Sequence, residues 1–251
     1  MIADYYCAMD VGARSNQEDC LLTGSGTHQG DSVADNGTLE GDRLVFAVCD
    51  GLGGHSGGET ASLFVSRLIA EHLNDPGLPP PDVSRALSAI QKKSNHAGLP
   101  DDSGTTVAGI LCADGNVTAY NAGDSRVYRL DSEGITRVSH DHSLVQRMVD
   151  SGNMAPEDAF HSPYKNVVDF GLGPGFADRW DSIEIHVRTE AARTDAWYLM
   201  CSDGVHDVLR DEEIHATLMP DPVKNGPILM EAISKRGFQD NTSYVVMGIR
   251  G

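Results

Sequence analysis

The sequence has few basic residues. Lys and Arg together number 19 against 37 Asp and Glu, which leaves a formal net charge of −18 at pH 7. This charge opposes binding to a nucleic-acid backbone or to an anionic membrane surface, because both depend on Lys and Arg. No apolar run approaches the ~20 residues that a membrane-spanning helix needs. Residues 1–10 have no basic residue ahead of an apolar stretch, so no secretory leader is predicted there.

Cysteine is also scarce. The five cysteines are an odd number, and no pair has CxxC or zinc-ligand spacing. Cys49, Cys112 and Cys201 lie in apolar runs, so we expect buried, reduced thiols rather than disulfides or a zinc site. Together with the charge, this predicts a cytoplasmic protein with no nucleic-acid or membrane partner. P-loop, HExxH, GxSxG and EF-hand motifs are missing as well, which argues against the sites that they build.

The remaining composition is that of a globular protein, with 40% hydrophobic and 22% charged residues in a chain of 251. This length predicts a single domain over residues 1–251. Short runs rich in Val, Ile and Tyr predict strands at 43–49, 105–112, 117–122, 126–130, 135–139, 183–187, 196–201 and 243–249. Apolar residues at helical spacing predict helices at 58–73, at 81–96, after Asp141, where Asp141 can cap, and at about 227–235 before Gly237.

The order of these elements differs from the regular βαβα alternation of a parallel sheet. We therefore predict an α+β fold, a β-sandwich of two antiparallel sheets flanked by α-helices. Asp114-Gly115 predicts a hairpin turn, and residues 104–139 predict an antiparallel meander. Residues 24–42 are predicted to be a polar loop, and residues 151–181 a surface flap.

Carboxylates at the ends of apolar strands are the most informative feature of the sequence. Residues 45–49 lead into Asp50-Gly51, and residues 197–202 lead into Asp203-Gly204. Further acidic positions of this kind are Glu18, Asp19, Asp124 and Asp240. Any single Asp-Gly can be a simple turn. Several carboxylates that converge would repel one another unless a cation lay among them, and a set without thiols favours Mg²⁺ or Mn²⁺.

Seven motifs cover nearly the whole chain, from Tyr5 to Ile249. They read RSNQED at 14–19, VFAVCDGLGGH at 45–55, SGTT at 103–106, NAGDSRVYRL at 121–130, DHSLV at 141–145, CSDGV at 201–205 and DNTS at 240–243. In this order they resemble the metal-dependent Ser/Thr protein phosphatases of the type 2C (PPM) family, in the compact catalytic domain found in bacteria. That family folds as the sandwich predicted above.

The resemblance implies a centre of two Mg²⁺ or Mn²⁺ ions and a third, weaker site. Asp50 is expected to bridge the two ions, with the Gly51 carbonyl on one of them. Asp203 and Asp240 are expected to hold the second ion, and Asp124 with Asp203 the third. A water shared by two such ions loses a proton near neutral pH and can attack phosphorus in line with the leaving oxygen.

The resemblance also assigns the residues that act on water and substrate. Glu18 and Asp19 are expected to orient the metal-bound water, and Arg14 to bind the substrate phosphate through two hydrogen bonds. The alternative for Arg14 is a surface salt bridge with Glu18 or Asp19. The implied activity is hydrolysis of phosphoserine and phosphothreonine in proteins, with a Ser/Thr kinase as the functional counterpart.

The sequence departs from the family pattern at three places. Leu52 stands where many eukaryotic members have a proposed acid, His, so the proton donor is unassigned, and His55 is a candidate. Arg14 and Glu18 are one residue closer than in many bacterial members. Residues 166–173 read NVVDFGLG where relatives often end in Arg-Ala-Leu-Gly. Two other functions stay open: a pseudophosphatase that binds phosphoproteins, and a phosphatase for a small metabolite.

Overall fold

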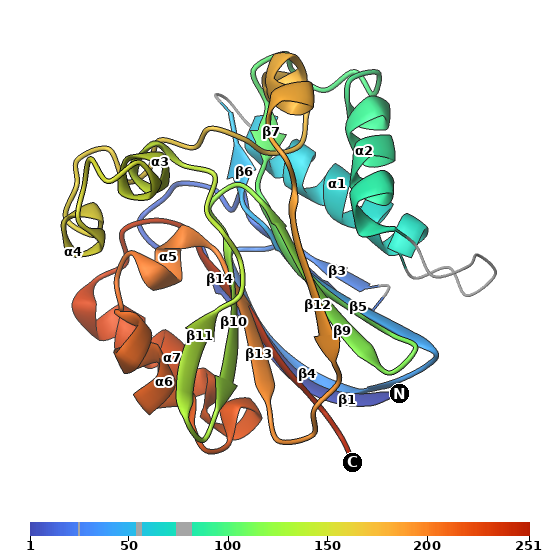
Figure 1. The fold of residues 1–251 in the computed structure, drawn as a ribbon, viewed down its shortest axis with the longest axis vertical. Helices are drawn as coiled ribbons and strands as arrows, with labels where there is room; N and C mark the ends of the chain where they lie inside the picture. The colour runs from blue at the N-terminus through green and yellow to red at the C-terminus, as the bar shows by residue number, and fades with distance from the viewer. Residues whose placement is uncertain (25, 54–56, 74–81) are drawn as a thin grey trace.

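The computed structural model describes residues 1–24, 26–53, 57–73 and 82–251. Two six-stranded sheets form the centre of the molecule, and helices cover their outer faces (Figure 1). Every strand pairing among the described residues is antiparallel. The predicted fold class, a β-sandwich flanked by helices, is therefore confirmed.

The strands fall into two large sheets and one small one. The first sheet has the order β11 (Gly134–Arg137), β10 (Arg126–Asp131), β13 (Trp197–Cys201), β14 (Thr242–Ile249), β1 (Ile2–Asp10) and β4 (Ser32–Glu40). The second has the order β12 (His186–Ala191), β9 (Asn116–Ala122), β8 (Val107–Ala113), β5 (Arg43–Cys49), β2 (Cys20–Thr23) and β3 (Gly26–His28). A two-stranded sheet pairs β6 (Gly51–Leu52) with β7 (Gly104–Thr105).

The helices lie on the two outer faces and around one end of the sandwich (Figure 1). On the second sheet lie α1 (Gly57–Leu73) and α2 (Val83–Ser94), and on the first lie α6 (Asp211–Leu218) and α7 (Pro222–Arg236). The shorter helices are α3 (Leu144–Asp150), α4 (Pro156–Ala159), the 3₁₀ helix η1 (Pro174–Ser182) and α5 (Asp203–His206). None of the helices within the described ranges is long and apolar enough to cross a membrane.

Three apolar layers explain the continuous apolar runs of the central strands. In β5 the side chains of Leu44, Phe46 and Val48 enter the core between the sheets. The alternate residues, including Val45 and Cys49, enter the core beneath α1 and α2. Because successive strand residues point to opposite faces, a strand buried on both faces must be apolar throughout. All five cysteines are buried and free, as expected.

The structure corrects several sequence predictions. Residues 24–42 are not a loop, because β3 and β4 lie there; β4 is an edge strand that pairs with β1 and leaves alternate residues exposed. Residues 104–139 are not one meander, because the chain crosses to the other sheet between β9 and β10. The strand predicted at 183–187 is β12, which starts at His186. Asp141 does not cap α3; the Ser143 side chain accepts a hydrogen bond from the Gln146 N–H.

Candidate metal centre

The register of the second sheet places Asp19 beside Asp50. Cys20 of β2 lies opposite Cys49 of β5 in an antiparallel pair. Asp19 precedes Cys20 and Asp50 follows Cys49, so both carboxylates lie at the same end of this strand pair. Residues of the predicted SGTT motif fix the Asp50 peptide, because the Thr105 hydroxyl and the Thr106 N–H both donate to its carbonyl oxygen at 2.8 Å.

The register of the first sheet gathers the other three aspartates at the same end of the sandwich. Cys201 of β13 lies opposite Arg126 of β10 and opposite Tyr244 of β14. Asp203 comes just after β13, and Asp124 and Asp240 come just before the two partner strands. All three therefore lie at the same end of these strands.

Close backbone approaches explain the two Asp-Gly pairs. A Cβ on Gly51 would lie 2.4 Å from the Glu18 and Gly58 carbonyl oxygens, and one on Gly204 would lie 2.1 Å from the Asn241 oxygen. No other residue fits at these positions without moving the backbone. The glycines therefore allow segments that carry different carboxylates to pack directly against one another.

The carboxylates of this end perturb one another electrostatically. Burial, followed by the charges of Asp19, Asp203, Asp124 and Asp240, raises the pKa of Asp50 well above its usual value. Burial and then the charge of Asp124 raise the pKa of Asp203 in the same way. Burial raises the pKa values of Asp19 and Asp124 to about 7. The five side chains therefore form a single electrostatic group.

The donor set fits a divalent cation. Asp19 is fully buried. The Ser243 and Ser202 hydroxyls lie near enough to lower its pKa, but neither carboxylate oxygen has a hydrogen-bond partner of normal geometry. A buried carboxylate without a partner is costly, and a cation bound nearby would compensate it. Oxygen-only donors are those that Mg²⁺ and Mn²⁺ prefer. Among the described residues, no three His, Cys, Asp or Glu side chains already stand at ligand geometry, so the assignment of individual ligands stays a prediction.

Arg14 pairs with a carboxylate that the sequence did not suggest for it. Its Nη2 lies 2.5 Å from the Asp240 Oδ2, and the guanidinium side chain is 54% exposed. The hydrogen bond to Asp240 raises the pKa of Arg14. Arg14 thus pairs with one member of the acidic group while about half of its side chain stays open to solvent. Glu18, by contrast, forms no ion pair with Arg14 in the described structure.

Asn241 is a residue of this site that sequence reasoning missed. Its side-chain oxygen accepts a hydrogen bond from the Glu18 N–H at 2.8 Å, and its amide nitrogen donates to the Val11 carbonyl at 2.8 Å and the Asn16 carbonyl at 3.1 Å. The side chain therefore holds the loop of Arg14, Glu18 and Asp19 against the start of β14. Its place beside Asp240 in the DNTS motif was the only sequence signal.

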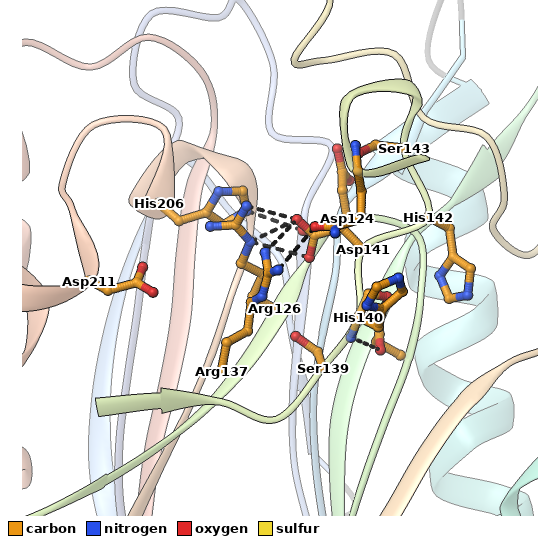
Figure 2. A network of polar contacts seen from close by, with 12 residues as sticks. Asp124, Arg126, Arg137, Ser139, His140, Asp141, His142, Ser143, His206 and Asp211 are labelled. Atoms are coloured by element: carbon orange, nitrogen blue, oxygen red, sulfur yellow. Dashed lines mark hydrogen bonds and ion pairs between the residues drawn. The ribbon is translucent and has the colours of Figure 1, made fainter. Parts of the chain in front are cut away.

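A polar network lies next to Asp124 (Figure 2). Asp141 accepts from Arg126 Nη2 at 2.7 Å and from Arg137 Nη1 at 3.2 Å. His206 Nε2 lies 3.1 Å from the Asp124 carbonyl oxygen, and His206 is 4% exposed. The network fixes the turn that carries Asp124 from both sides. Leu52 is partly buried in β6, whereas His55 lies outside the described residues.

Comparisons with known proteins agree with this architecture. The profile of the family described as "Protein phosphatase 2C" matches residues 23–224. The chain is 32% identical over 259 residues to the serine/threonine protein phosphatase PstP of Mycobacterium tuberculosis, covering 99% of this chain and 45% of that protein. It therefore spans about half the length of that curated relative. It is 25% identical over 228 residues to the serine/threonine phosphatase stp of Listeria monocytogenes, covering 85% of this chain and 88% of the relative.

Solved structures give the same result. A crystal structure of the M. tuberculosis phosphatase PstP/Ppp matches with a TM-score of 0.79 and 28% identity over 100% of both chains. A structure of the PstP catalytic domain in complex with two manganese ions matches with a TM-score of 0.75 and 28% identity, also over the full length of both chains. The resemblance drawn from the seven motifs is confirmed, and the chain belongs to the protein phosphatase 2C family.

Proposed function

We propose that this chain is a Mg²⁺- or Mn²⁺-dependent phosphatase that hydrolyses phosphoserine and phosphothreonine in proteins. The observation that supports it most directly is the group of Asp19, Asp50, Asp124, Asp203 and Asp240 at one end of the sandwich, where neighbouring acids help to raise the pKa values of Asp19, Asp50, Asp124 and Asp203. Its membership of the family and the two manganese ions in a related catalytic domain support the same activity.

The metal ligands of the proposal are Asp50, the Gly51 carbonyl, Asp203 and Asp240, with Asp124 and Asp203 at a third, weaker site. When bound, two such ions supply a water of lowered pKa and neutralise charge that develops on the phosphoryl group. The chain's own part is to hold the carboxylates on the ends of rigid strands, so that little reorganisation is needed during the reaction.

Arg14, Glu18 and Asp19 carry the remaining roles. The planar guanidinium of Arg14 can bind two phosphoryl oxygens at once, and its exposed side leaves room for them. Glu18 lies on the loop that Asn241 fixes, and the two carboxylate oxygens of Asp19 are buried without a hydrogen-bond partner of normal geometry. We expect both to accept protons or hydrogen bonds from water at this site.

The complete acidic set argues against the binding-only alternative, since a pseudophosphatase typically lacks one or more metal carboxylates. We infer in addition a role in signal transduction opposite a Ser/Thr kinase. The five buried, reduced thiols are consistent with a cytoplasmic location.

The test is Mn²⁺-dependent hydrolysis of an aryl phosphate and of a phosphoserine peptide. Asp203→Asn should lower kcat by about 1,000-fold, because the metal contributes several kcal/mol of transition-state stabilisation. Asp195→Asn, at a surface carboxylate that is 72% exposed, is the matched control and should keep wild-type activity. Full activity of Asp203→Asn, or of wild type in excess chelator, would contradict the proposal. Turnover of small phosphates without turnover of the peptide would favour a metabolite phosphatase.

A further inference from the structure

A lobe of the chain stands beside the metal centre and is anchored at a narrow base. It consists of residues 151–167, the first part of the segment predicted as a flap over 151–181; it contains α4, and only this part is called the flap below. At its base the Asp169 N–H donates to the His142 carbonyl at 2.9 Å, and the Leu144 N–H donates to the Val167 carbonyl at 3.0 Å. The C-terminal end of the lobe is thereby tied to the residues before α3, and its tip extends towards α5 and α6 (Figure 1).

Apolar burial contributes little to the position of the flap. α4 has no buried residue, and the side chains of Tyr164 and Val167 are 56% and 42% exposed. The stabilisation from burial scales with the apolar area removed from water, which is small here. The position of the flap must therefore depend on its polar contacts with the rest of the molecule.

One ammonium group makes two of these contacts. Lys165 Nζ lies 2.8 Å from the Asp207 Oδ2 and 3.4 Å from the Gln239 Oε1. The Lys165 and Asp207 side chains are only 23% and 16% exposed, so water screens this pair less than a typical surface pair. An ammonium carries three donors on a flexible stem, which allows it to bridge two acceptors.

The two acceptors belong to the segments that carry two predicted metal ligands. Asp207 is the C-terminal cap of α5, the helix that begins at Asp203. Gln239 directly precedes Asp240. Lys165 therefore links the flap to both segments at once.

The flap also forms a wall of a cavity that includes Asp124, a predicted ligand of the third metal site. This cavity of about 430 Å³ is lined by Phe160 and Lys165 from the flap, by Asp207 and Arg210 from the opposite wall, and by Asp124. The Arg210 guanidinium lies 4.8 Å from the centre of the Phe160 ring, across the same gap. Any movement of the flap away from Asp207 would widen this cavity next to Asp124.

We propose that Lys165 is a positioning residue that holds the flap against α5 and the start of β14, and so sets how a phosphorylated protein segment approaches the metal centre. This inference rests on the proposed function. We expect a small aryl phosphate to need no contact with the flap, whereas a peptide that extends on either side of its phosphoserine is long enough to touch it. Lys165 therefore acts on peptide binding more than on the chemical step.

The experiment compares Lys165→Met, Lys165→Arg and wild type with Mn²⁺ bound. Lys165→Met keeps the length of the side chain and removes its charge. We expect its KM for a phosphoserine peptide to rise about fivefold with kcat within twofold, as the loss of one partly buried ion pair implies. The ratio of kcat/KM for the peptide to kcat/KM for an aryl phosphate should also fall about fivefold, because the value for the aryl phosphate should not change. Lys165→Arg should restore most of the peptide KM.

Hydrogen exchange of residues 151–167 is the readout that does not depend on activity. Their backbone amides should exchange about fivefold faster in Lys165→Met than in wild type. Lys235→Met is the matched control, since Lys235 forms a 2.7 Å pair with Glu231 on the surface of α7. It should match wild type in flap exchange and in peptide KM.

Two results would overturn the inference: flap exchange in Lys165→Met equal to that of wild type, or equal losses on the peptide and on the aryl phosphate. A wild-type enzyme that hydrolysed neither substrate would contradict the proposed function instead. The exchange rates alone would then decide whether Lys165 holds the flap.

Discussion

The buried ion pair of Asp141 allows a strong prediction about stability. Asp141 is 5% exposed and accepts hydrogen bonds from Arg126 Nε at 2.9 Å and Nη2 at 2.7 Å, and from Arg137 Nη1 at 3.2 Å. Asp141→Asn removes the one negative charge that both guanidinium groups share. Breaking one partner of a buried pair costs about 3 kcal/mol or more of unfolding free energy. For a domain of this size that corresponds to a Tm lower by roughly 6–12 °C.

The chain contains a control of the same chemistry in a different environment. Asp195 accepts two hydrogen bonds from Arg193, at 2.9 and 3.0 Å, but the two side chains are 72% and 42% exposed. Asp195→Asn should leave the Tm within about 1 °C of wild type, because water screens the exposed pair. Equal decreases in Tm for Asp141→Asn and Asp195→Asn, measured by calorimetry at pH 7, would show that burial does not set the strength of these ion pairs.

The ion pair of Asp141 should also make the stability of the protein depend on pH. Burial acts to raise the pKa of Asp141, but the charges of Arg126 and Arg137 outweigh it and hold that pKa below the usual value. A lowered pKa contributes stability above the unfolded pKa, and this contribution is lost as the pH falls through the folded pKa. The Tm difference between wild type and Asp141→Asn should therefore be largest near neutral pH and shrink below about pH 4.

Three further predictions concern the metal centre and the thiols. The pKa values of Asp19 and Asp124, raised to about 7, predict that the Tm of the chelated protein falls as the pH rises from about 5 to 8. Added Mn²⁺ should therefore raise the Tm more at the higher pH. A thermal scan in which the Tm increase caused by Mn²⁺ became smaller with rising pH would contradict this. Asn241→Ala should lower the free energy of unfolding by about 2–3 kcal/mol in urea titrations and reduce kcat/KM. Asn116→Ala removes one exposed hydrogen bond and should change neither quantity. None of the five cysteines should react with a thiol reagent in the native protein, and all five should react after unfolding; rapid native labelling would show that the cores open readily.

The sequence predicted best those strands whose surroundings are apolar on both sides. β5 was predicted to the residue, since a strand between two cores must be apolar at every position. β4 was missed because it lies at a sheet edge, where Ser32, Ala34 and Asn36 face solvent; its nine residues are strand only because β1 pairs with them. The crossing between β9 and β10 was missed because neither of the two runs indicates which sheet it joins.

The candidate site was predictable as a set of positions but not as a set of contacts. Strand ends followed by Asp-Gly, together with the family resemblance, pointed to the carboxylates. The pairing of Arg14 with Asp240 joins residues 226 apart in sequence, and that of Glu18 with Asn241 joins residues 223 apart. No local pattern encodes such contacts, since they arise only when β14 pairs with β1 and the loop after β1 lies against the start of β14. The bridge from Lys165 to Asp207 and Gln239 was hidden because it also joins segments that are far apart in sequence.

The most direct test of the account is anomalous diffraction from crystals soaked in Mn²⁺. We predict two peaks about 3.5–4 Å apart, the separation of two-metal sites. The Asp50 carboxylate should bridge them, and Asp203 and Asp240 should lie on one of the two ions. A map with no manganese within contact of Asp50, or with a single ion that Asp203 and Asp240 do not reach, would contradict the central claim.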